Sequence, residues 1–131
     1  AEPAEQALRL LGTAEEESGA LPDLAGRELL CVGGRVNLRE HYRNLVERCN
    51  GRFSYHDGGI EDGALRLHGL LQRADAVICP SDCVGHPAYH EVKRLCKRTG
   101  KTCVLLSGSG LGSFSRGLHA LNADDANIIS L

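Results

Sequence analysis

Short apolar runs recur along this chain at nearly even intervals, and this spacing limits the folds that the chain can adopt. The runs begin 24, 23, 27 and 24 residues apart. They are short and rich in Leu, Val, Ile, Cys or aromatic side chains, which is typical of buried strands. We predict strands over 28–32, 52–56, 75–79, 102–106 and, with a weaker pattern, 126–129.

The segments between these runs carry apolar residues at helical spacing, so that one side of each helix can be buried. Three such faces are Leu38, Tyr42, Leu45, Val46 and Cys49; Leu67, Leu70, Leu71 and Ala74; and Ala88, Val92, Leu95 and Cys96. Gly51 and Gly100 are expected to take the left-handed conformation that commonly follows a helix. Pro87 suits the first helical position, which makes His86 the expected N-cap.

Strands that alternate with helices at this spacing indicate βαβ units, in which parallel strands form a sheet covered on both faces. We therefore predict a small Rossmann-like or flavodoxin-like α/β domain of four to five strands over residues 28–131. Residues 1–27 are expected to form an N-terminal amphipathic helix and a linker, which pack on the domain or on a second subunit. A homo-oligomer is expected.

Composition narrows the function classes. A chain of 131 residues with 42% hydrophobic content fits one domain with a core. The net charge of -2 gives no overall bias toward nucleic acid, which is not an expected partner. No run approaches the roughly 20 apolar residues of a membrane helix. With an acidic, amphipathic start, a cytoplasmic location follows, where the six cysteines would stay reduced.

The residues that follow the strands carry the candidate chemistry, because ligands of open parallel sheets bind beyond the carboxyl ends of the strands. The first four strands are followed by 33–35, 56–59, 80–86 and 107–110. If the strand order is 2-1-3-4, these segments meet near the point where the order reverses. The crevice would then be lined by Arg35, His56, Asp57, Cys79, Asp82, Cys83 and His86.

Five motifs occur in this order and spacing: Cys31-Val-Gly-Gly-Arg35, Tyr42-Arg43, His56-Asp-Gly-Gly59, Cys79-Pro-Ser-Asp-Cys-Val-Gly-His86 and Lys93-Arg-Leu-Cys-Lys97. With this combination, the chain resembles a bacterial family catalogued as a domain of unknown function, over roughly residues 28–121. Some members are associated with haem and oxygen chemistry. The resemblance therefore implies the α/β fold and favours a haem ligand.

Haem binding is the first functional expectation. Cys79-Pro80 is a dipeptide found in regulatory haem-binding segments. His86, ahead of His56, is the predicted axial ligand, and Arg35 and Arg43 are predicted to meet the propionates. Because the chain has only three Tyr, two Phe and no Trp, aliphatic residues would line the slot. No acid–base arrangement or nucleophile elbow indicates an enzyme, so we expect a module that binds a small molecule or gas, or that has a redox role.

Two alternatives remain open. Cys79, Cys83 and His86 are ligand types that suit zinc or non-haem iron, as in a metal-binding regulator. The glycine-rich loops at Gly33-Gly34 and 107–113 could instead hold a nucleotide or another anion through free N–H groups. Asp57 would then meet a ribose hydroxyl. Cys79 could equally be a buried thiol without a ligand role.

Overall fold

A five-stranded parallel sheet forms the centre of the protein. The computed structural model describes residues 21–58, 63–80, 86–123 and 127–131. The strands are β1 (Glu28–Val32), β2 (Arg52–His56), β3 (Ala76–Pro80), β4 (Thr102–Leu106) and β5 (Ile128–Ser130). All pairs are parallel, and the order is β2-β1-β3-β4-β5. This is the flavodoxin-like order, which confirms the predicted fold class.

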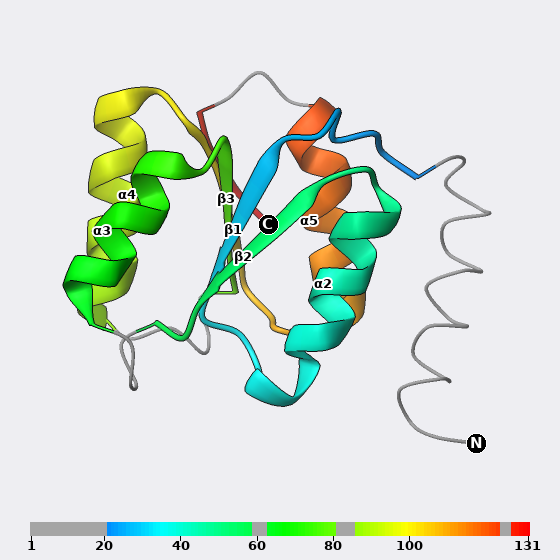
Figure 1. Ribbon diagram of the computed structural model, residues 1–131, viewed down its shortest axis with the longest axis horizontal. Helices are drawn as coiled ribbons and strands as arrows, with labels where there is room; N and C mark the ends of the chain where they lie inside the picture. The colour runs from blue at the N-terminus through cyan, green and yellow to red at the C-terminus, as the bar shows by residue number, and fades with distance from the viewer. Residues whose placement is uncertain (1–20, 59–62, 81–85, 124–126) are drawn as a thin grey trace.

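Helices cover both faces of this sheet. They are α2 (Arg39–Arg48), α3 (Ala64–Arg73), α4 (His86–Thr99) and α5 (Leu111–Ala123), with a short 3-10 helix η1 (Val36–Leu38) before α2. Figure 1 shows α2 and α5 on one side of the sheet, and α3 and α4 on the other. The order reverses between β1 and β3, because the helices that follow these two strands lie on opposite faces.

Alternating side chains of each strand divide the core into two layers, as the pleat of a strand requires. On β1, Cys31 packs with the α2 and α5 side chains, whereas Leu30 and Val32 pack with those of α3 and α4. On β3, Ile78 belongs to the first layer and Cys79 to the second. The first layer also buries Tyr42 and Phe114, whose rings stack with centroids 4.4 Å apart.

The last part of the predicted linker packs directly on the domain. Leu24 is 2% exposed, and its N–H donates to the carbonyl of Cys49 at 2.7 Å. Farther along, the N–H of Arg52 donates to the carbonyl of Arg27 at 2.9 Å. Residues 21–27 are thus fastened to the turn between α2 and β2. The amphipathic helix predicted before them lies outside the described residues.

Five local predictions need correction. Helix α4 begins at His86, so His86 is its first residue rather than its N-cap. Strand β3 covers Ala76–Pro80, one residue later than predicted, and β5 begins at Ile128. The predicted loop 107–113 is partly helical, because α5 begins at Leu111. At the end of α2 the left-handed residue is Asn50, with φ of 60°, rather than Gly51. Gly51 is instead needed for space: a Cβ there would lie 2.6 Å from Cδ1 of Leu24.

Two other predictions can be compared with the structure. Gly100 has φ of 76°, which confirms the left-handed residue after α4. Within the described ranges, none of the helices is long and apolar enough to cross a membrane.

Candidate functional site

A pocket of about 680 Å³ lies between α3 and α4, beyond the carboxyl end of β2. We call it the α3–α4 pocket. It is lined by His56, Gly58, Gly63, Ala64, Leu65, Leu67, His68, Ala88, Glu91 and Arg94. Its volume falls within the roughly 300–1,000 Å³ of typical small-molecule sites. Its walls are mainly apolar, with a few polar side chains on α3 and α4.

His56, a predicted ligand, forms part of the wall of this pocket with both ring nitrogens in use. The side chain is 1% exposed. Nδ1 accepts a hydrogen bond from the N–H of Gly58 at 3.1 Å, and Nε2 lies 3.0 Å from the carbonyl oxygen of Gly63. These partners assign a neutral ring with its proton on Nε2. The imidazole therefore links the end of β2 to the start of α3, and metal ligation by His56 would require one bond to break.

A second histidine, which the sequence did not single out, also lines the pocket. Nδ1 of His68 on α3 lies 3.8 Å from Oε1 of Glu91 on α4. This distance allows electrostatic attraction but is too long for a hydrogen bond. Nη2 of Arg94 donates to both carboxylate oxygens of Glu91 at 2.8 Å. The hydrogen bond from Arg94 is the main reason why the pKa of Glu91 is below its usual value, so the carboxylate stays charged beside His68.

The sequence contained a partial signal for this trio. Glu91 and Arg94 are three residues apart, the spacing of ion-paired neighbours on a helix. His68 directly follows the buried Leu67, at the border of the apolar face of α3. His68 and Glu91 come together because α3 lies beside α4. The sequence pattern of either helix alone does not predict this contact.

The loop after β1 contacts the loop after β4, next to the point where the strand order reverses. Gly33 and Gly34 have φ of 86° and 80°, which favours glycine at both positions. The backbone N–H of Arg35 donates to the hydroxyl of Tyr42 at 3.2 Å, and this hydroxyl donates to the carbonyl of Ser109. Nε of Arg35 also donates to the Ser109 hydroxyl at 3.1 Å. The Arg35 side chain is thereby held near the start of α5.

Close packing explains why this loop requires Gly34. A Cβ at Gly34 would lie 3.0 Å from the ring of Tyr42 and 3.1 Å from Pro80. The loop after β1 thus passes between α2 and the end of β3. This packing role accounts for the second glycine of the loop without a bound anion.

Cys79 is part of the core between the sheet and the helices α3 and α4. Its side chain is fully buried, and burial raises the pKa of its thiol to about 12, with a smaller contribution from Cys96. The sulfur is therefore a protonated thiol at neutral pH. Among the described residues, no group of three or more His, Cys, Asp or Glu side chains is arranged to hold a metal ion.

The other predicted site residues lie in several places. Arg43 stands over the ring of Phe53 on the side of α2, with its guanidinium carbon 5.2 Å from the centroid. Asp57 is half-buried just after β2. Asp82 and Cys83 lie outside the described residues, and the structure describes only the backbone of His86, as the first residue of α4.

Fold and pocket together define a flavodoxin-like α/β domain with a mainly apolar pocket beyond its edge strand. The chain belongs to a bacterial family, because the family model described as an uncharacterized protein conserved in bacteria (DUF2325) matches residues 28–121. This match covers most of the chain and confirms membership of a bacterial family of unknown function. No curated protein and no solved structure matches the chain.

Proposed function

We propose that this protein is a haem-binding module for a gas or redox role, and that the haem lies in the α3–α4 pocket. One observation carries the proposal: a mainly apolar pocket of about 680 Å³ is lined by two imidazoles, a carboxylate and a guanidinium. Haem needs an apolar slot, an axial ligand and a cation for its propionates. When bound, its iron would supply gas binding or one-electron chemistry.

His68 is the residue that would hold the haem iron in this arrangement. A histidine that ligates a metal through one ring nitrogen usually has a carboxylate or carbonyl beside the other. The Glu91 carboxylate lies on the Nδ1 side of His68, and Arg94 fixes that carboxylate. The Nε2 atom is thus the ligand atom that we assign. His86 stays a predicted ligand, since it lies two residues before Ala88, which lines the pocket.

The apolar part of a tetrapyrrole would contact Leu65, Leu67 and Ala88. Leu65 is 89% exposed although it lines the pocket, so an apolar ligand would cover a side chain that now faces water. Arg94, the cation among the described residues of the pocket lining, would meet a propionate. We assign His56 a positioning role, because its two hydrogen bonds hold the pocket wall.

The proposal also includes a cellular location and an oligomeric state. Five described cysteines are free and buried, which fits a reducing, cytoplasmic environment. We interpret the protein as a binding module that forms a homo-oligomer, rather than as an enzyme. The zinc or non-haem iron alternative has less support, because the Cys79 side chain is fully buried in the core between the sheet and the helices α3 and α4.

Nucleotide or anion binding by the glycine-rich loops is the second candidate. The observation that favours it is the position of Arg35, whose exposed side chain is held by Ser109 beside the loop of Gly33 and Gly34. A guanidinium group suits phosphate through charge-assisted hydrogen bonds. The N–H groups of Gly33 and Arg35 already donate to the His56 carbonyl and to the Tyr42 hydroxyl, so Arg35 itself carries this candidate. Tight packing of Gly34 against Tyr42 and Pro80 is a structural reason for the same sequence, so this candidate ranks second.

The test is an absorption spectrum of protein purified from haem-replete cells, with iron analysis of the same sample and haem titration of the apoprotein. We expect a Soret band with about one iron per chain. His68→Ala should shift or remove the band, and Glu91→Gln should weaken haem binding about 10–100-fold, as changes of partners to a ligand do.

His119→Ala is the matched control, since His119 lies on α5 on the opposite side of the sheet. It should keep the wild-type spectrum. An unchanged Soret band in the His68→Ala, His86→Ala double variant would refute ligation by these two histidines. A colourless protein that does not bind added haem would refute the proposed function itself.

A further inference from the structure

The edge of the sheet at β2 carries a local concentration of positive charge. β2 is the first strand in the sheet order, and among the described residues it pairs only with β1. The N–H of Arg52 and the carbonyl of His56 bond toward β1, to Arg27 and Gly33. Because backbone groups alternate along a strand, those of Phe53 and Tyr55 face away from β1.

A groove of about 440 Å³ runs along this edge between α2 and α3. We call it the arginine groove, and its cations are Arg39 and Arg43 from α2 and Arg66 and Arg73 from α3. No described carboxylate lines it. The whole chain has a net charge of -2, so this concentration of guanidinium groups is a local feature.

Carboxylates of the described residues lie beside the groove and offset part of its positive charge. Oε2 of Glu40 forms an ion pair with Nε of Arg43 at 3.3 Å, and Glu28 accepts from the Ser54 hydroxyl at 3.2 Å. Like charges one helical turn apart destabilise a helix. Arg39 and Arg43 are such a pair on α2. An anion in the groove would offset this repulsion.

Aromatic rings orient two of the guanidinium groups. The guanidinium carbon of Arg39 lies 5.5 Å from the centroid of Tyr55, and that of Arg43 lies 5.2 Å from the centroid of Phe53. Both distances are within the roughly 6 Å of a cation–π contact. Burial, the main cause, raises the pKa of Tyr55 to about 12, so its phenol keeps a proton to donate. Its buried hydroxyl has no hydrogen-bond partner among the described residues.

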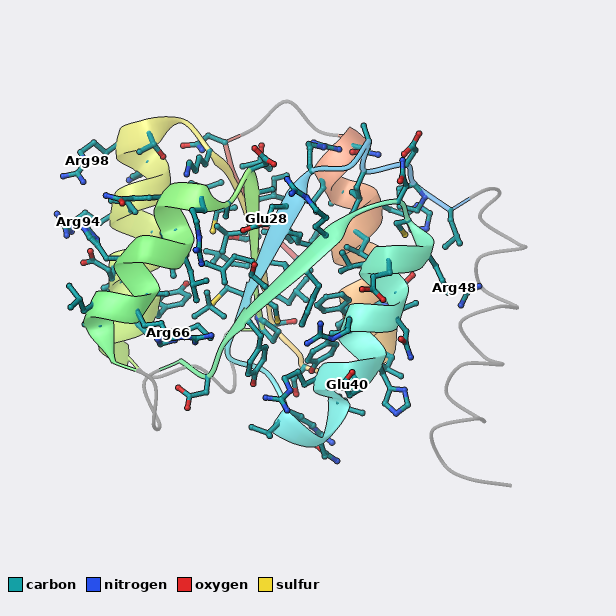
Figure 2. The ribbon with its side chains drawn as sticks, viewed as in Figure 1. Glu28, Glu40, Arg48, Arg66, Arg94 and Arg98 are labelled. Atoms are coloured by element: carbon teal, nitrogen blue, oxygen red, sulfur yellow. The ribbon has the colours of Figure 1, made fainter. Side chains whose placement is uncertain are left out.

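The edge is poorly suited to accept an added strand. Nη1 of Arg66 donates to the carbonyl oxygen of Tyr55 at 3.1 Å, which occupies an outward backbone group that a pairing strand would need. Figure 2 shows Arg66 extending from α3 toward β2. A compact anion therefore fits this surface better than an acidic peptide in extended form.

We propose that the arginine groove binds a phosphate-bearing polyanion. Guanidinium groups recognise phosphate through paired, charge-assisted hydrogen bonds, and several of them around one groove match a ligand with several negative charges. The volume of about 440 Å³ is within the range of small-molecule sites. This site uses different cations from the α3–α4 pocket, so it does not depend on haem binding.

The test is isothermal titration of the full chain with sodium tripolyphosphate at low and moderate salt. We expect saturable binding that weakens about tenfold or more in Arg39→Gln, Arg73→Gln. The matched control is Arg48→Gln, Arg98→Gln, which removes the same charge from the ends of α2 and α4 (Figure 2). The control should bind within twofold of the parent chain. Thermal melts of both variants check that each is folded.

Two further titrations identify the source of the phosphate. Tighter binding of ATP than of tripolyphosphate would indicate a nucleotide, and tighter binding of a ten-residue oligonucleotide with a steep salt dependence would indicate a nucleic-acid backbone. Either outcome supports the groove if the Arg39, Arg73 variant loses it. The proposal is wrong if tripolyphosphate does not bind, or if Arg35→Gln abolishes binding while Arg39→Gln, Arg73→Gln leaves it intact.

Discussion

The two faces of the sheet are packed differently. On the side of α2 and α5, Tyr42 and Phe114 are fully buried and stacked, and the Tyr42 hydroxyl bonds two separate loops. On the side of α3 and α4, the described core has thiols and aliphatic groups, and a pocket remains between the helices. One face is closed by large rings, and the other leaves space for a ligand.

The closed face therefore serves as the scaffold, and the open face holds the candidate site. On the closed face, the buried Tyr42 hydroxyl is satisfied by hydrogen bonds to other parts of the chain. On the open face, His68, Glu91 and Arg94 are all partly exposed and line the pocket. Ligand-binding residues are commonly held by a rigid scaffold in this way. Substitutions on the two faces should therefore differ in their effect on stability.

The largest difference is expected between Phe114→Ala and Leu65→Ala. Removal of the fully buried Phe114 ring leaves a cavity beside Tyr42 and should lower the free energy of unfolding by about 3–5 kcal/mol. Leu65 is 89% exposed, so its truncation should change stability by less than about 0.5 kcal/mol. Urea denaturation followed by circular dichroism measures both. Equal losses would mean that the closed face is not the stabilising half.

Glycine substitutions should have opposite signs on the two faces. A Cβ at Gly117 of α5 would lie 2.7 Å from Cδ1 of Ile78 and 3.1 Å from Cδ2 of Leu106. Both neighbours are buried, so Gly117→Ala should destabilise the protein by about 1–3 kcal/mol. Gly69, within the exposed side of α3, has no heavy atom within 4 Å of such a Cβ. Gly69→Ala should stabilise the helix by about 0.5–1 kcal/mol.

Thermal melts of the two alanine variants provide the measurement. Midpoints that move in opposite directions would support the comparison. If Gly117→Ala also raised the midpoint, α5 would have room to shift, and the closed face would be less tightly packed than its contacts indicate.

The fold was accessible from the sequence because it depends on repeated patterns. Strands β1, β2 and β4 begin and end where the apolar runs predict. Helix α5 was harder to predict: its apolar residues Leu111, Phe114 and Leu118 have helical spacing, but Gly and Ser between them have lower helix propensity. In the structure, Gly117 allows α5 to lie close to the sheet, a packing requirement that propensity does not capture.

The candidate site could be predicted only in part from the sequence. The sequence indicated the carboxyl ends of the strands, and the pocket lies beyond the end of β2. It also suggested one crevice for Arg35 and His56, yet Arg35 bonds Ser109 while His56 lines the α3–α4 pocket. Which face a loop side chain approaches depends on long-range packing, such as that of Tyr42 against Ser109, which no local pattern encodes.

A pH-dependent effect is expected from the thiol of Cys79, which is buried on the open face. Its pKa rises from 9.0 to about 12 on folding, chiefly because the thiol is buried and also because Cys96 is near. Between these values the unfolded chain releases a proton that the folded chain keeps, so stability falls as the pH rises. From pH 8 to pH 10, this group should reduce the free energy of unfolding by about 1 kcal/mol. Cys79→Ala should remove that part of the pH dependence.

Leu105→Ala is the matched control, because Leu105 is buried in the same layer but does not titrate. It should lower stability at every pH and keep the wild-type slope. Tyr55 adds to the slope only above its ordinary value of 10.0, so urea denaturation at intervals from pH 8 to pH 10 separates the two groups. If Cys79→Ala and Leu105→Ala have the same slope, the Cys79 thiol is accessible to water, and the open face extends deeper than the pocket between α3 and α4.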